Sequence, residues 1–184
     1  MSDVTDAHVL ILATDGFEQS ELFDPRAALL DAGVEVTLAS IATDPIQGMR
    51  HDEKGETITP DITLDEVDID DYDALMLPGG VANPDALRLQ PRAIETIRGF
   101  AAAGKPIAAI CHAPWLLIEA DVVRGKRATS WPSVRTDLAN AGADVVDQEV
   151  VVDGNLITSR KPDDIPAFND ALLTMLRERV SEAA

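Results

Sequence analysis

The chain has 184 residues, which is enough for one domain with a sizeable core and too few for two ordinary ones. Its formal net charge of −18 argues against nucleic acid and anionic membrane surfaces as partners. One cysteine excludes an internal disulfide, and three scattered histidines argue against a structural zinc cluster, so we expect no metal and no cofactor. The first residues carry neither a basic region nor a long apolar run, so we expect no signal peptide, no membrane span and a cytoplasmic location.

A short continuous apolar run, typical of a strand buried on both faces, occurs at residues 8–13, and further strands are predicted at 34–41, 72–77 and 105–110. Helical patterns follow at residues 18–32, 91–103 and 113–120. Pro25 lies inside the first of these, and we expect a kink or a break there, with two helical segments meeting near Asp24. Alternating strands and helices predict an α/β fold with a mainly parallel sheet covered on both faces.

The rest of the chain has weaker signals. The polar segment 42–72 is rich in turn residues, with short strands expected near Thr57 and Ile62. Asp153-Gly154 lies between two runs of β-branched residues, which predicts a β-hairpin near the C-terminus. A helix is expected at 133–141 and a long one at 163–182. Neither a repeat nor a linker interrupts the sequence, so residues 1–184 are interpreted as a single domain.

The segment around Cys111 is the most informative part of the sequence. An apolar run reaches the cysteine, meets His112 and turns at once into a helical pattern, which is the outline of a nucleophile elbow. Small residues two positions before and after it, Ala109 and Ala113, suit the close approach of strand and helix at such a corner. The first amides of the following helix should lower the pKa of the thiol. The alternative is that Cys111 is a small buried hydrophobic residue.

Three strand ends supply polar groups to the same sheet edge. Glu18 follows the first strand, Gly79 and Gly80 follow the third, and Cys111 ends the fourth. A carboxyl, a thiol and free backbone amides are the groups needed for covalent attack on a carbonyl. The amide of His112 and that of Gly79 or Gly80 would then bind the oxyanion. Taken singly, Glu18 could be a first-turn acid and the glycine pair a tight turn, whereas together they favour function.

Five segments of the chain resemble the signature segments of the DJ-1/PfpI superfamily. The resemblance is closest to its PfpI-like branch of intracellular cysteine peptidases and general stress protein 18 types, and the segments are Asp15–Leu22, Leu77–Gly80, Ala109–Pro114, Thr129–Pro132 and Thr158–Pro162. The resemblance implies a flavodoxin-like sheet sandwiched by helices, similar to class I glutamine amidotransferases. Those enzymes take their histidine from late in the chain, and no histidine follows His112 here, so glutamine hydrolysis of that type is not expected.

By position, the resemblance places the nucleophile at Cys111 and its adjacent histidine at His112. It places the acid that shares a hydrogen bond with the thiol at Glu18, which in its protonated form would donate to the thiolate. In PfpI-like proteins a further carboxylate orients the histidine from a neighbouring subunit, and Asp85 stands at the matching place. The family usually has a glutamate there, in a slightly shorter loop.

Trp131 and Arg160 match positions that line the site in relatives. The relatives often have a tyrosine at the position of Trp131. The resemblance implies a homodimer or hexamer that acts on small carbonyl compounds, peptides or glycated proteins, as a peptidase, a deglycase or a glyoxalase. The alternative is a non-catalytic stress sensor in which Cys111 is oxidised to sulfenic or sulfinic acid. A general base at His112 favours the enzyme, because a sensor has no use for one.

Overall fold

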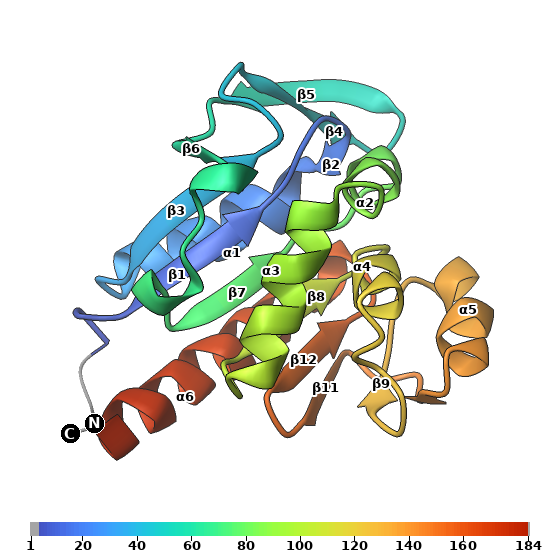
Figure 1. The fold of residues 1–184 in the computed structure, drawn as a ribbon. Helices are drawn as coiled ribbons and strands as arrows, with labels where there is room; N and C mark the ends of the chain where they lie inside the picture. Colours follow the sequence, from blue (N-terminus) through green and yellow to red (C-terminus); the bar gives the residue numbers. More distant parts are fainter. Residues whose placement is uncertain (1–3, 184) are drawn as a thin grey trace.

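The computed structural model describes residues 4–183 as a central sheet between two layers of helices (Figure 1). The sheet has seven strands in the order β11-β12-β8-β7-β1-β3-β6, and every neighbouring pair is parallel except β11 with β12. The strands are β1 His8–Leu12, β3 Glu35–Ser40, β6 Ile62–Thr63, β7 Ala74–Leu77, β8 Ile107–Ile110, β11 Val150–Asp153 and β12 Leu156–Ser159. The predicted α/β class with a mainly parallel sheet is confirmed.

The continuous apolar runs form strands because both faces of the sheet are covered. In β1, Leu10 and Leu12 belong to the core on one face, whereas Val9 and Ile11 belong to the core on the other. All four side chains are fully buried. Successive side chains of a strand point to opposite faces, so only a strand between two helical layers gives such a run.

Two pairs of helices cover the faces (Figure 1). On one face lie α3 Pro91–Ala102 and α4 Pro114–Glu119, and on the other α1 Gln19–Asp31 and α6 Ile165–Ala183. Of the kink or break expected near Asp24, the break is wrong, because α1 runs continuously through a buried Pro25. A proline inside a helix removes one backbone hydrogen bond, and the packing of Leu22 and Leu29 in the core opposes that loss.

Smaller elements surround the carboxyl edge of the sheet. β2 Phe17–Glu18, β4 Ile46–Arg50 and β5 Glu53–Ile58 form a second sheet, and β9 Arg127–Ala128 pairs with β10 Asp144–Val145. The short helices are α2 Ala82–Leu87 and α5 Arg135–Asn140, with 3-10 turns at Leu64–Glu66, Ile69–Asp71, Pro132–Val134 and Pro162–Asp164.

The strands expected near Thr57 and Ile62 are present as β5 and β6, whereas β4 and α2 were not predicted. The predicted hairpin joins β11 and β12, and Gly154 in its turn has φ 59°. Across the described residues, no helix is long and apolar enough to cross a bilayer.

Candidate active site

Cys111 occupies a backbone bend between β8 and α4. Its φ of 66° lies in the left-handed region, which a non-glycine residue adopts only when its surroundings hold it there. The Cys111 amide donates to the Ser159 carbonyl at 3.0 Å, and its carbonyl accepts from the Trp131 amide at 2.9 Å. Two neighbouring segments therefore hold this corner, and the bend is the elbow that the sequence predicts.

The carboxyl beside the thiol belongs to Glu21 and not to Glu18. Glu21 is fully buried on the first turn of α1, and its Oε2 accepts the Gly79 amide at 2.9 Å. The carboxyl also lies within hydrogen-bonding reach of the Cys111 thiol. Its other oxygen, Oε1, has no hydrogen-bond partner among the described residues.

The pKa of Glu21 is raised to about 8, mainly because the carboxyl is buried. The nearby Glu18 charge also raises this pKa, whereas hydrogen bonds from Cys111 and from the Gly79 and Gly80 amides lower it. Glu21 is therefore largely protonated at neutral pH. A protonated carboxyl has a proton to donate, and the unpartnered Oε1 is the oxygen free to carry it.

Cys111 is only 5% exposed, and this burial raises the pKa of its thiol. A charged Glu21 raises the pKa of the thiol too. Amides of Gly80 and His112 point at the sulfur and act in the opposite direction. The sequence predicts a lowered pKa for this thiol from those amides alone. That prediction is wrong, because burial raises the pKa by more than the amides lower it. Glu21 and Cys111 instead form a buried pair in which a proton on the carboxyl removes its repulsion of a thiolate.

The two glycines after β7 have different tasks. The Gly79 amide is bound to Glu21, so of the two only the Gly80 amide stands beside the sulfur, together with that of His112. Gly80 has φ 79°, and a Cβ there would collide with the Gly16 carbonyl oxygen. Both observations show why glycine stands at position 80.

His112 completes the cluster around the sulfur. Its Nδ1 lies 3.2 Å from Sγ of Cys111, and its Nε2 lies 3.5 Å from Oγ of Ser133. The ring stacks on Trp131 with centroids 5.6 Å apart and meets the edge of Trp115 at 5.1 Å. Burial lowers the pKa of His112, so the neutral imidazole, which can accept a proton, is favoured at neutral pH.

A cavity of about 370 Å³ opens above the sulfur, and Gly80, Cys111, His112 and Trp131 line it as the sequence predicts. Glu18 also lines this cavity, but it accepts the His51 amide at 3.1 Å through Oε2. The remaining lining residues are Gly16, Glu21, Met49, His51, Val81, Ala82 and Pro162. Sequence analysis did not predict Met49 on β4 or His51 in the turn after it as cavity residues, because it did not predict that strand.

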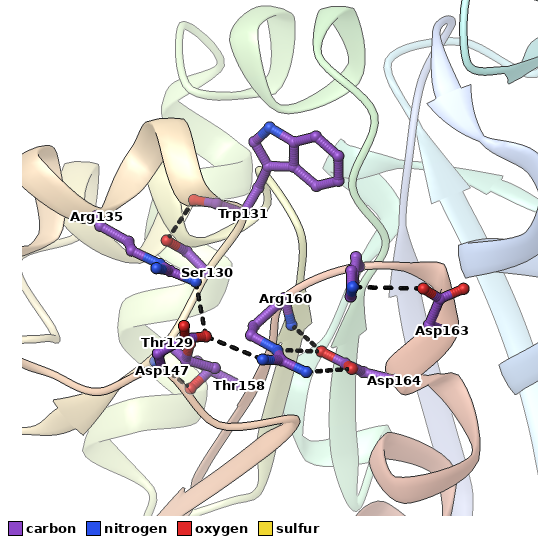
Figure 2. A network of polar contacts seen from close by, with 10 residues as sticks. Thr129, Ser130, Trp131, Arg135, Asp147, Thr158, Arg160, Asp163 and Asp164 are labelled. Atoms are coloured by element: carbon purple, nitrogen blue, oxygen red, sulfur yellow. Dashed lines mark hydrogen bonds and ion pairs between the residues drawn. The ribbon is translucent and has the colours of Figure 1, made fainter.

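Arg160 does not line this cavity. Figure 2 shows its side chain between Asp147 and Asp164, with its guanidinium 2.9 Å from each carboxylate. Asp147 also pairs with Arg135 at 2.8 Å. The expectation that Arg160 lines the cavity is therefore wrong, because two carboxylates hold its guanidinium.

Asp85 is exposed on α2 and does not line the cavity of its own chain. A role of Asp85 in a neighbouring subunit stays a prediction. Within residues 4–183, no three histidine, cysteine or acidic side chains come together in a group that could hold a metal ion.

Comparisons with known proteins agree with this geometry. Residues 7–175 match the model of the DJ-1/PfpI family. The chain is 46% identical to protein/nucleic acid deglycase 2 of Escherichia coli, over 91% of this chain and 96% of that one. It is 42% identical to general stress protein 18 of Bacillus subtilis, over 92% and 98%.

Among solved structures, Drosophila melanogaster DJ-1beta superposes with a TM-score of 0.84 at 31% identity, over 97% of both chains. A family match across nearly the whole sequence, together with relatives above 40% identity, supports the resemblance that the motifs indicated. The chain belongs to the DJ-1/PfpI family.

Proposed function

We propose that this protein is a cysteine-dependent deglycase, which removes dicarbonyl-derived groups such as the methylglyoxal adduct from amino groups. The observation that carries the proposal is the arrangement of Cys111, Glu21 and His112 in one cavity. A thiol at a strained corner stands beside a carboxyl whose pKa is raised to about 8 and 3.2 Å from an imidazole. Relatives named as deglycases support the same activity.

The proton positions suit a nucleophilic thiol. Neutral His112 can take the thiol proton through Nδ1, and protonated Glu21 can donate a hydrogen bond to the resulting thiolate. The amides of Gly80 and His112 stabilise the charge on the sulfur. They also stand where an oxyanion forms once the sulfur binds a carbon.

The reaction balances without a cofactor. The thiolate attacks the carbon that bears the hydroxyl and the substrate nitrogen, a carbon–sulfur bond forms, and the amine leaves with a proton. In the hemithioacetal that remains, His112 removes the proton from the sulfur-bearing carbon, the hydroxyl proton on that carbon passes to the neighbouring ketone oxygen, and a proton returns to the ketone carbon. The first carbon is thereby oxidised and the second reduced, which gives a lactoyl thioester. Water then hydrolyses the thioester to lactate and the free thiol. Free methylglyoxal enters the same sequence by addition of the thiolate to its aldehyde carbon.

The charge of the chain favours protein adducts over nucleic acid adducts. The relative from Escherichia coli is named for both substrates. At a formal net charge of −18, however, a polyanion is repelled from this chain, whereas a small adduct on a protein side chain is not.

A redox sensor is the competing function. Such a protein needs an oxidisable sulfur and a donor to the oxidised form, which Cys111 and Glu21 provide. It does not need an imidazole on the sulfur, so the position of His112 favours turnover.

The test measures lactate released from methylglyoxal-treated Nα-acetyl-lysine by the wild type and by three variants. We expect Cys111→Ser to abolish release and His112→Ala to lower it at least a hundred-fold. His8→Ala is the matched control, since His8 lies at the start of β1 and does not line the cavity. Full release by Cys111→Ser would refute the proposal. Oxidation of Cys111 to sulfenic or sulfinic acid by hydrogen peroxide in the wild type, with no lactate formed, would favour the sensor.

A further inference from the structure

The cavity above Cys111 contains a carboxylate for which the proposed chemistry has no use. Glu18 lines the same cavity as the sulfur, while Glu21 occupies the position beside the thiol. Among the residues that line it, none is a lysine or an arginine, and most of the other side chains are apolar: Met49, Val81, Ala82, Trp131 and Pro162. Glu18 therefore brings a negative charge to a mainly apolar cavity.

The backbone of the β4–β5 hairpin holds Glu18 in place. β2 pairs with β4, so that Glu18 lies opposite Met49, and the turn that follows β4 brings the His51 amide 3.1 Å from Oε2. His51 has φ 60°, a conformation that aims this amide and that non-glycine residues rarely adopt. The other oxygen, Oε1, takes no hydrogen bond from the described residues, so it is available to a ligand.

A cation with hydrogen-bond donors is the ligand group that fits these surroundings. A carboxylate in a partly desolvated cavity binds ammonium or guanidinium through charge-assisted hydrogen bonds. Trp131 lines the same cavity, and an indole ring attracts a cation that lies over its face. Free methylglyoxal and its thiol adducts are neutral and gain nothing from either group.

We propose that Glu18 is the specificity residue of this cavity and selects substrates that carry a cationic nitrogen near the adduct carbon, that is, amine and guanidine adducts over thiol adducts and free dicarbonyl. This inference rests on the proposed function, because it assigns the substrate class of the same cavity. It also gives Glu18 a role that differs from the acid role expected from sequence.

A binding measurement tests the inference without turnover. Iodoacetamide alkylates Cys111, and a ligand in the cavity slows this reaction. We expect butylguanidinium to protect the wild type at about ten-fold lower concentration than butylurea, its neutral isostere. In Glu18→Gln the two compounds should protect equally. Glu53→Gln removes the same charge from an exposed position on β5 outside the cavity, and it should keep the ten-fold difference.

A kinetic measurement supplies the second readout. The quantity compared is kcat/KM for the methylglyoxal adduct of Nα-acetyl-arginine amide divided by kcat/KM for free methylglyoxal. We expect this ratio to fall about ten-fold in Glu18→Gln and to stay at the wild-type value in Glu53→Gln. Equal protection by the two compounds in the wild type would overturn the inference, and so would an unchanged ratio in Glu18→Gln. If no variant or wild type turns over either substrate, the proposed function fails, and the protection experiment still decides whether the cavity selects a cation.

Discussion

The Glu21 carboxyl lies against the Cys111 thiol in a buried pair, and the Gly79 amide fixes it there through a 2.9 Å bond to Oε2. Both groups lose solvation in the fold, which raises the pKa of each. The pair therefore favours a state with one proton on the carboxyl. This relationship makes the protonation of Glu21 measurable in both stability and thiol reactivity.

The first expectation concerns stability against pH. The pKa of Glu21 rises from an ordinary 4.5 to about 8 on folding, so the folded state keeps a proton that the unfolded state has released over this range. The stabilisation is fully present below pH 4.5 and is lost as pH rises through 8, by at most about 5 kcal/mol. Glu21→Gln cannot ionise and still accepts the Gly79 amide, so it should lack this loss.

The measurement is the free energy of unfolding in urea at pH 5, 6.5 and 8.5 for the wild type and for Glu21→Gln. The other carboxylates titrate alike in both proteins, so the difference between the two curves isolates Glu21. The Gln variant should gain on the wild type as pH rises. Two parallel curves would mean that Glu21 ionises normally in the folded protein.

A second expectation concerns thiol reactivity. The amide of Gln at position 21 can accept from Gly79 and donate to the thiolate, as protonated Glu21 does. Leu at the same position can do neither and leaves the Gly79 amide without a partner. We expect Glu21→Gln to be alkylated by iodoacetamide at pH 7 within about three-fold of the wild-type rate, and Glu21→Leu at least ten-fold more slowly. Circular dichroism serves as the control that both variants are folded. Equal alkylation rates in the two variants would show that Glu21 does not activate the thiol.

Much of the fold follows from the sequence because its strands are buried on both faces. Continuous apolar runs such as 8–13 have one interpretation when helical patterns alternate with them. The elbow at Cys111 could also be predicted, since it depends on a local change from strand to helix. By contrast, β4 is short, contains a glycine and alternates buried with partly exposed residues, and its pairing with β2 and β5 makes it a strand.

The acid was misassigned because one helical turn separates two glutamates. Glu18 precedes α1 and faces the cavity, whereas Glu21 is buried three residues later. A signal was present in the sequence, because Glu21 stands four residues before Pro25 and eight before Leu29, on the face of α1 that is buried. The role expected for Arg160 failed for another reason, since Asp147 and Asp164 reach it only through the tertiary fold.

A third expectation compares two glycines with positive φ. Gly80 and Gly104 have φ of 79° and 64°, so an alanine at either position costs about 1 kcal/mol of backbone strain. A Cβ at Gly104 meets nothing within 4 Å, whereas one at Gly80 collides with the backbone oxygen of Gly16. We expect Gly80→Ala to lose at least about 3 kcal/mol of unfolding free energy and the activity with it. Gly104→Ala should lose about 1 kcal/mol and keep its activity, and equal losses in thermal or urea unfolding would contradict the close approach at Gly80.

A fourth expectation concerns Ser133, the hydroxyl on the far side of His112. The Oγ to Nε2 distance of 3.5 Å makes it a weak partner that positions the imidazole. Ser133→Ala should lower kcat for methylglyoxal about three-fold with KM nearly unchanged, and Ser133→Thr should retain more of the activity. A large rise in KM would instead show that Ser133 binds substrate.

The last expectation asks whether Asp85 of a second copy orients His112. The long contact to Ser133 leaves Nε2–H of neutral His112 able to donate to a better acceptor, and Asp85 is exposed on α2. Val81 and Leu89 beside this helix are 57% and 77% exposed, as expected for a surface that another subunit covers.

We expect Asp85→Asn and Cys111→Ser each to be nearly inactive alone. Mixed in equal amounts and allowed to exchange subunits, they should recover about one quarter of the wild-type activity. Half of the dimers are then mixed, and one of the two sites in each joins an intact thiol to an intact carboxylate. The matched control mixes Cys111→Ser with His112→Ala, whose defects lie in the same cavity, so no dimer holds an intact site. Recovery in neither mixture, or full activity of Asp85→Asn by itself, would confine the site to a single chain.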